Sequence, residues 1–425
     1  MQNRNGLHDP RSDRFETLQR ISLTSELPLG RQLSGHFAYI PQYGLCTLPR
    51  GRTCTPRGGA LIRALTGLRF WLCLSVLCVH LPFPRYERSF GPIIDSFVHN
   101  AGFAMVGFFV LSGFCTALGY SKKLGHFDRE TSVAYLKRRL WKLYPLYFVT
   151  VVWVTAAGLC VEHSLKDLMH YALMFGFECS LLQSLSIVKW GTGSTWFVST
   201  IFFCYLATPP ALAWSGKWSS RKLAAGILVC LLAFLVLRLA AIPMSEETRL
   251  GFLYAFPGAR IWQYLAGLFL GQIFLRKNSE LRHATALEFL AAALCLFALF
   301  FNALFGLSQI EQGMALLYTP VSLFAIWIFA HSGGLLSKIL ASGPVHFLGA
   351  LSMEIFLIHY CVIFFGFGKL FGGLPYLPRD LIILAITFAL SLLWKFGISR
   401  TLEAAKKRRK GQKLQRGNSR RHLQG

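Results

Sequence analysis

Charged residues are scarce in this chain, and acidic residues are the scarcest. Only 15% of the 425 residues are charged, against roughly 25% in a soluble domain. Asp and Glu together number 19, while Lys and Arg number 44. Hydrophobic residues make up 54% of the chain, and the mean hydropathy is +0.46. This composition excludes an ordinary soluble domain and predicts a membrane protein.

The sequence also lacks the common patterns of metal and nucleotide chemistry. The eleven cysteines include no CxxC pair, and eight of them fall within apolar segments, where cysteine serves as a small packing residue. Zinc-ligand spacing, a P-loop and a GxSxG nucleophile elbow are all absent. We therefore expect no metal site, no disulfide framework and no nucleotide-binding fold.

Long apolar segments predict an all-α membrane protein of about ten transmembrane helices. The loops expected inside the cell carry fourteen Lys and Arg and the opposite loops carry seven, so the positive-inside rule places both the N- and C-termini in the cytoplasm. The predicted spans are residues 62–83, 99–118, 144–162, 195–213, 223–241, 258–275, 285–305, 314–331, 345–367 and 380–399.

Two polar segments flank this predicted membrane domain, which covers residues 61–400. Residues 1–60 form a polar, arginine-bearing N-terminal extension that we expect to be disordered, since it has neither helical nor strand periodicity and no signal-peptide apolar run. Residues 401–425 form a basic cytoplasmic tail with the run Lys406 to Lys410. Because this run directly follows the last span, its expected partner is anionic membrane lipid and not nucleic acid.

Two ionisable side chains interrupt the first predicted span, Arg69 and His80. Eleven residues of α-helix bring His80 back to within about 20° of the Arg69 face, roughly 16 Å further along the axis. A group that titrates near neutral pH is unfavourable inside a membrane unless it has a partner or a role. This helix face is therefore the first candidate for a functional site.

Six stretches, taken together and in order, resemble the integral-membrane acyltransferase 3 family. Each stretch alone is a weak pattern, but the six cover the predicted membrane region in the family's order. They are Gly67 to Arg69 with His80, GFFVLSGF (107–114), YLKRRLWKLYPLY (135–147), STWFVSTIFFCYL (194–206), FPGARIWQYLAG (256–267) and LGALSMEIFLIHY (348–360).

The resemblance implies a multi-pass O-acyltransferase of the bacterial inner membrane. Members of this family move an acyl group, commonly acetyl from acetyl-CoA, onto hydroxyls of extracytoplasmic carbohydrates. The expected partners are therefore an acyl-CoA donor, used as a co-substrate with no bound cofactor, and a carbohydrate acceptor. His80 is the expected general base, because imidazole has an unperturbed pKa of about 6.5. Arg69 shares its helix face, and His359 either orients the acceptor, shares the proton transfer or is structural.

Donor and acceptor contacts are assigned by side of the membrane. Arg138, Arg139 and Lys142, with Arg69, lie on the cytoplasmic side and are candidates to bind the CoA phosphates, arginine by bidentate contacts. The alternative is ordinary positive-inside charge. Trp196 and Arg260 lie at the outer ends of their predicted spans. Trp196 is a candidate to stack on a sugar, or it belongs to the interfacial aromatic belt. Arg260 contacts the substrate or snorkels to headgroups.

The sequence departs from the family at several positions, and these departures concern the acceptor more than the reaction. Thr66 stands where many members have an acid, Ile201 and Phe202 occupy positions that are often Glu, and Gln263 replaces a frequent Glu. A rival interpretation is a polytopic transporter or flippase for a small solute or lipid-linked glycan, since intramembrane ionisable residues also mark transport paths. The two halves of the chain show no convincing internal repeat of the kind common in transporters.

Overall fold

The structure, a computed structural model, describes residues 56–81, 101–160, 164–186, 193–277, 280–304, 316–364 and 373–401. Every regular element in these ranges is helical, and no strand occurs among them. The predicted N-terminal extension up to residue 55 and the basic tail from residue 402 lie outside the described residues.

Each of the ten predicted spans coincides with a long helix. These helices are α2 (Pro56–His80), α5 (Ala101–Tyr120), α6 (Arg129–Leu159), α8 (Thr195–Ser215), α9 (Ser220–Ala240), α11 (Pro257–Arg276), α12 (Ala284–Leu304), α14 (Tyr318–His331), α16 (Gly343–Phe364) and α18 (Tyr376–Leu392). The remaining elements lie between or after them: α7 (Leu165–Cys179), η1 (Gln183–Leu185), α10 (Glu246–Leu250), η2 (Gly251–Ala255), α15 (Leu335–Leu340) and η3 (Leu393–Ile398).

Seven of the described helices are long and apolar enough to cross a membrane, namely α2, α5, α6, α8, α9, α16 and α18 with its continuation. The apolar stretches of α12 and α14 are shorter. Helix α11 carries Arg260, Gln263 and Gln272, all buried inside the bundle. The protein is therefore a multi-pass helical membrane protein, while the count of ten spans and the cytoplasmic position of both ends stay predictions.

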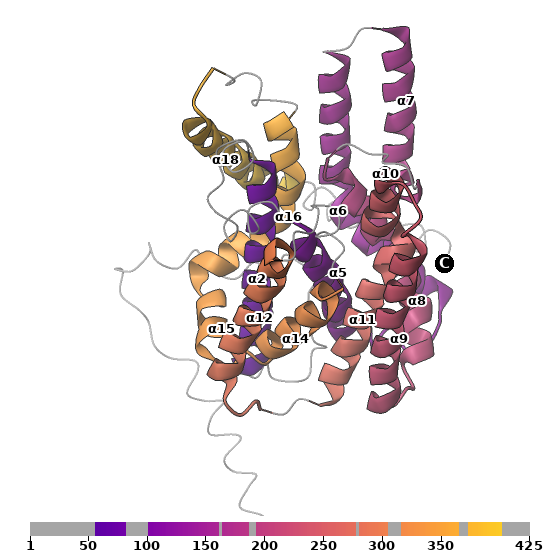
Figure 1. Cartoon of the computed structure of the whole chain (residues 1–425), viewed down its shortest axis with the longest axis vertical. Coiled ribbons are helices and arrows are strands. Elements are labelled where there is room, and N and C mark those ends of the chain that lie inside the picture. The colour runs from indigo at the N-terminus through magenta and orange to yellow at the C-terminus, as the bar shows by residue number, and fades with distance from the viewer. Residues whose placement is uncertain are drawn as a thin grey trace, which may run out of the picture. The chain divides into compact units, whose positions relative to one another are not determined.

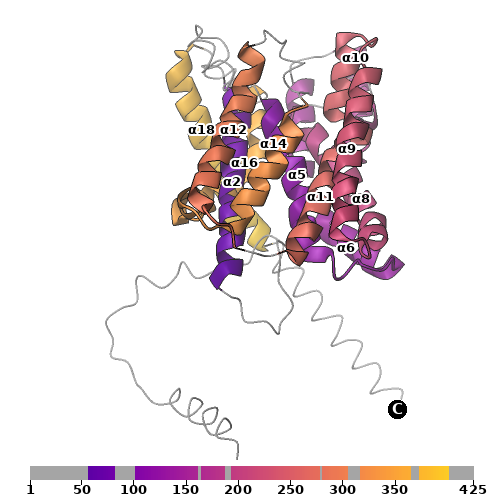
Figure 2. The same cartoon turned by 60° about the horizontal axis from the view of Figure 1, so that its bottom comes forward.

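Glycine residues allow the backbones of neighbouring helices to approach closely within the bundle. A Cβ atom on Gly113 of α5 would overlap the carbonyl oxygen of Tyr264 on α11, and one on Gly349 of α16 would overlap that of Thr66 on α2. Small residues at such contacts let two helices pack backbone against backbone. Helix α2 contacts α5, α14, α15 and α16, so it lies inside the bundle (Figure 1). Figure 2 shows the long helices running side by side.

Helix α6 begins well before the predicted span 144–162. Its first turn is capped by Asp128, whose side chain accepts hydrogen bonds from the Thr131 backbone N–H (2.8 Å) and hydroxyl (2.5 Å). The helix then continues without a break through Pro145 to Leu159. The helix that holds the predicted span 144–162 therefore begins earlier than the span, because this cap starts it within the polar segment.

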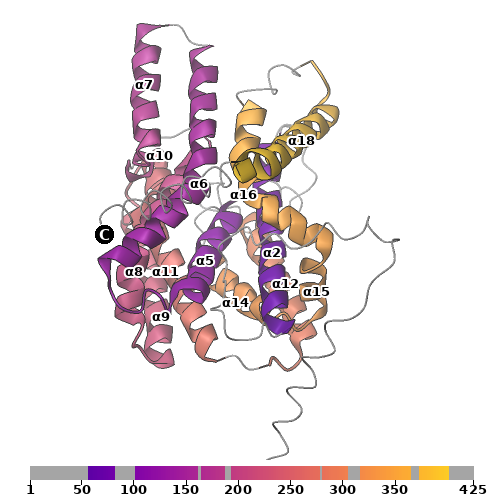
Figure 3. The same cartoon turned by 180° about the vertical axis from the view of Figure 1, so that it is seen from behind.

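Helix α7 lies beside the second half of α6, as the views in Figures 1 and 3 agree. It exposes the large apolar side chains of Leu168, Met169 and Leu173. Its end is anchored by Glu178, which is buried and accepts a hydrogen bond from the Thr195 hydroxyl at 2.9 Å. The end of α7 is therefore tied to the start of α8.

Candidate active site

His80 and His359 meet at one end of the bundle. His80 is the last residue of α2 and is partly buried, and His359 on α16 is fully buried. His359 Nε2 lies 3.4 Å from His80 Nδ1, and the ring centroids are 5.1 Å apart. The structure thus brings together the two histidines that were predicted from separate motifs, because α2 and α16 run parallel.

Backbone carbonyls assign the protons on both rings. His80 Nδ1 lies 2.8 Å from the carbonyl oxygen of Val76, and His359 Nδ1 lies 3.1 Å from that of Ile355. A carbonyl oxygen only accepts, so each neutral ring carries its proton on Nδ1. His359 Nε2 then lies 3.4 Å from His80 Nδ1, whose hydrogen is shared with the nearer Val76 carbonyl oxygen, and the basic nitrogen of His80 is Nε2. This is the arrangement that a general base with an orienting partner needs.

Aromatic side chains enclose the histidine pair. The Tyr360 ring meets the His80 ring edge to face at 5.7 Å, and the Phe356 ring lies 5.9 Å from that of His359. Gly193, at a left-handed φ of 59°, packs directly against the Tyr360 ring, where a Cβ atom would overlap it. Only glycine suits this turn, which brings the start of α8 against the pair.

Trp196 and Arg260 lie in a second part of the same region. The Trp196 ring is 4.8 Å from that of Tyr254, and the Arg260 guanidinium lies 5.0 Å from the Tyr254 ring centre. Arg260 is fully buried at 0% exposure. Its side chain therefore does not reach the headgroup surface, and the snorkelling alternative is wrong. Trp196 is partly buried.

The cations predicted to bind the donor gather away from the histidines. Lys142 lies within electrostatic reach of Arg69 and Arg139, and Arg69 is about 16 Å from His80 along α2. Arg69 also lies within electrostatic reach of Cys115. Lys395 is in turn within electrostatic reach of Arg69. We call these four residues, Arg69, Arg139, Lys142 and Lys395, the cationic cluster. Arg138 is exposed.

Arg139 occupies a tyrosine cage inside this cluster. Its guanidinium carbon lies 5.1, 5.4 and 5.0 Å from the ring centres of Tyr120, Tyr135 and Tyr205, respectively. Its Nη2 donates to the Thr116 hydroxyl at 3.1 Å, and its buried Nε has no hydrogen-bond partner. Cation–π contacts hold the guanidinium in place without neutralising its charge. Arg139 is therefore suited to bind an anion.

Sequence reasoning missed one charged pair next to the cluster. Lys395, on the π-helical turn η3, lies 3.7 Å from Glu354 on α16, and both side chains are buried. Lys395 also donates to the Ala350 carbonyl oxygen and is within electrostatic reach of Arg69. The available signal was one acidic and one basic residue inside two apolar spans, since such charges usually pair.

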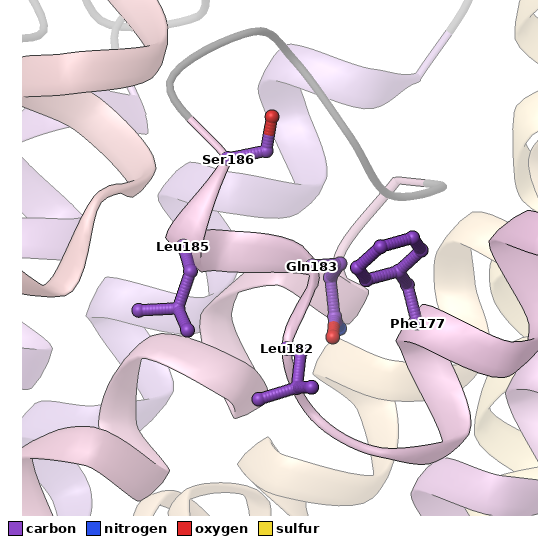
Figure 4. Close-up of a pocket in the computed structure, with 5 residues that line it drawn as sticks. All are labelled: Phe177, Leu182, Gln183, Leu185 and Ser186. Atoms are coloured by element: carbon purple, nitrogen blue, oxygen red, sulfur yellow. The ribbon is translucent and has the colours of Figure 1, made fainter.

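A pocket of about 310 Å³ opens between α7 and η1 (Figure 4). Its lining is formed by Phe177, Leu182, Gln183, Leu185 and Ser186. Behind it, Gln183 Nε2 donates to the Tyr147 hydroxyl at 2.8 Å, and this hydroxyl donates to the Glu178 carbonyl oxygen at 2.6 Å. The network ties α6 to the end of α7 and to the segment before α8.

The bundle and its buried ionisable groups define a class: a multi-pass membrane protein with an imidazole pair toward one end and a cationic cluster toward the other. A family model described as an acyltransferase domain, that of the acyltransferase 3 family, matches residues 62–395. The chain therefore belongs to this family and is an enzyme that transfers acyl groups, and the resemblance based on the six motifs is confirmed.

Two curated relatives agree with this assignment. The chain is 24% identical over 352 residues to the acyltransferase MdmB of Streptomyces mycarofaciens, covering 78% of this chain and 86% of MdmB. It is 26% identical over 325 residues to the putative peptidoglycan O-acetyltransferase YrhL of Bacillus subtilis strain 168, covering 71% of this chain. The match spans 48% of the length of YrhL. No solved structure matches the chain.

Proposed function

We propose that this protein transfers an acyl group, acetyl in the first instance, from cytoplasmic acyl-CoA to a hydroxyl of a cell-surface or exported carbohydrate across the bacterial inner membrane. The observation that carries this proposal is the contact between His80 and His359, which brings together two imidazoles from separate family motifs, since an imidazole is suited to take a hydroxyl proton. A carbohydrate acceptor is supported by the O-acetyltransferase named among the relatives.

In the proposed reaction His80 acts directly on the acceptor. Its Nε2 takes the hydroxyl proton while the acceptor oxygen attacks the thioester carbonyl carbon. As the tetrahedral intermediate collapses, the C–S bond breaks, an ester forms and the CoA thiolate leaves with the proton returned from His80. His359 orients the imidazole through the His80 Nδ1–H.

The cationic cluster is the proposed site for the donor phosphates. Arg139 and Lys142 on α6, together with Arg69 on α2, bring positive charge together at this end of the bundle. The donor then extends its thioester arm along α2 from Arg69 toward His80. Trp196 is the proposed side chain that stacks on the sugar.

The test is transfer of label from acetyl-CoA to a mixture of oligosaccharides by the purified protein. We expect covalent acetylation, and His80→Ala should lower the rate by about 10²- to 10⁴-fold, the usual contribution of a positioned base. Near-normal transfer by a folded His80→Ala variant would remove His80 from the mechanism. Uptake of an oligosaccharide into vesicles without acetylation would favour a transporter.

A further inference from the structure

Arg260 is a buried cation whose charge no carboxylate in the described ranges balances. Its side chain is 0% exposed, and the ion pair formed among the described residues joins Lys395 and Glu354, not Arg260. A charge taken out of water is unfavourable unless an opposite charge or hydrogen bonds compensate it. The neighbours of Arg260 therefore decide what this site is built to accept.

These neighbours are neutral. Arg260 Nε donates to the Tyr254 carbonyl oxygen at 2.8 Å, and Nη1 donates to Gln263 Oε1 at 2.9 Å. The rings of Tyr254 and Phe109 lie 5.0 and 5.8 Å from the guanidinium carbon. Amide and carbonyl oxygens orient the guanidinium but leave its full positive charge in place.

Two buried donors at this site have no hydrogen-bond partner, Arg260 Nη2 and Gln263 Nε2. Buried N–H groups are almost always bonded, so two orphaned donors on adjacent side chains point to a missing acceptor. An anionic oxygen satisfies both donors and the charge together, whereas a neutral sugar hydroxyl leaves the charge uncompensated.

The position of these donors relates them to the acceptor side of the bundle. They lie on the first turns of α11, whose positive helix end also favours an anion. Ring contacts lead from Phe109 to Phe197 (5.0 Å), from Phe197 to Phe356 (5.1 Å) and from Phe356 to His359 (5.9 Å). Arg260 and the histidine pair thus border one continuous aromatic group.

We infer that Arg260 and Gln263 bind a carboxylate or other anionic group of the acceptor, so that the acceptor is an acidic carbohydrate. This inference rests on the proposed function for its reaction, while the binding site itself is independent of whether transfer occurs. Because Gln263 is neutral, the Arg260 charge stays uncompensated until an anionic ligand binds. A glutamate at this position would compensate the charge without a ligand.

The decisive variant is therefore Gln263→Glu, which has nearly the same shape. We would compare a uronate-containing oligosaccharide with the same oligosaccharide after reduction of its carboxyl groups, measuring both equilibrium binding and transfer from acetyl-CoA. The wild type should favour the acidic form by about tenfold or more, and Gln263→Glu should bring this ratio near unity.

Gln272→Glu provides a matched control on the same helix. Gln272 is also buried, donates to the Ser215 hydroxyl at 2.7 Å and belongs to neither substrate site. This variant should keep the wild-type preference for the acidic oligosaccharide. Thermal unfolding of each variant shows whether it is folded, and Gln263→Glu should be at least as stable as the wild type because Arg260 gains a counterion.

The outcomes separate this inference from the proposed function. A preference for the acidic ligand that survives in Gln263→Glu, or equal wild-type binding of both ligands, overturns the inference even if transfer occurs. Loss of acyl-CoA binding in Gln263→Glu also overturns it, since the anion would then belong to the donor. Acid-selective binding that Gln263→Glu abolishes supports the site even if no acetyl transfer is detected, in which case only the proposed function fails.

Discussion

Among single residues, His359 is the proposed positioning partner of the base, since its Nε2 lies 3.4 Å from His80 Nδ1. His359→Ala should lower kcat by about tenfold to a hundredfold with little change in either KM, because it removes the acceptor that orients the base and no proposed substrate contact. His359→Gln should recover part of kcat, since its amide oxygen also accepts. Steady-state kinetics with both substrates checks this, and a loss confined to KM would contradict it.

Arg139 and Arg138 are neighbours in sequence but differ in surroundings, which makes them a matched pair. Arg139 lies in the tyrosine cage with a buried, unpartnered Nε, while Arg138 is exposed. Arg139→Ala should weaken acyl-CoA binding by about tenfold or more, equivalent to about 1.4 kcal/mol, and Arg138→Ala by less than about threefold. Calorimetry with a CoA thioether analogue measures both. Equal effects of the two substitutions would indicate that neither arginine binds the donor specifically and that both only follow the positive-inside rule.

At the scale of helices, the Lys395–Glu354 pair joins the π-helical end of α18 to α16. Lys395→Met leaves the buried Glu354 carboxylate without this cation, so it should lower the free energy of unfolding by about 3 to 5 kcal/mol. The double variant Lys395→Met with Glu354→Leu should recover most of this loss, because neither charge of the pair is then left without its partner. Unfolding of the wild type, both single variants and the double variant in mixed detergent micelles measures this double-mutant cycle. Additive losses would show that the two charges are not coupled.

The sequence allowed the helices to be predicted far better than their contacts. Apolar length located ten helices, and six motifs led to the family. The early start of α6 was missed because the Asp128 cap precedes a polar segment that hydropathy does not register. The His80–His359 contact and the π-helical turn at Lys395 depend on packing between helices remote in sequence, and no local pattern encodes either. A search for opposite charges in apolar spans would have found Glu354 and Lys395.

For the whole molecule, the parallel course of α2 and α16 constrains the number of membrane crossings. His80 meets His359 at one end, and Thr66 meets Gly349 toward the other. Two parallel spans require an odd number of crossings between them. The described helices α5, α6, α8, α9, α11, α12 and α14 supply seven, so crossing by all of them agrees with the contacts. If α11 alone did not cross, α16 would run antiparallel to α2.

Helix α11 is thus the critical test of the ten-span topology, because its polar side chains face the bundle interior and lower its apparent hydropathy. Reporter fusions after Lys217, Pro243 and Lys277 bracket α9 and α11. Green fluorescent protein should fluoresce after Lys217 and Lys277, where basic residues predict the cytoplasm, and alkaline phosphatase should be active only after Pro243. The same reporter result at Pro243 and Lys277 would show that α11 does not cross. The cationic cluster and the histidine pair could then no longer be assigned to opposite sides of the membrane. The proposed route from cytoplasmic donor to external acceptor would fail.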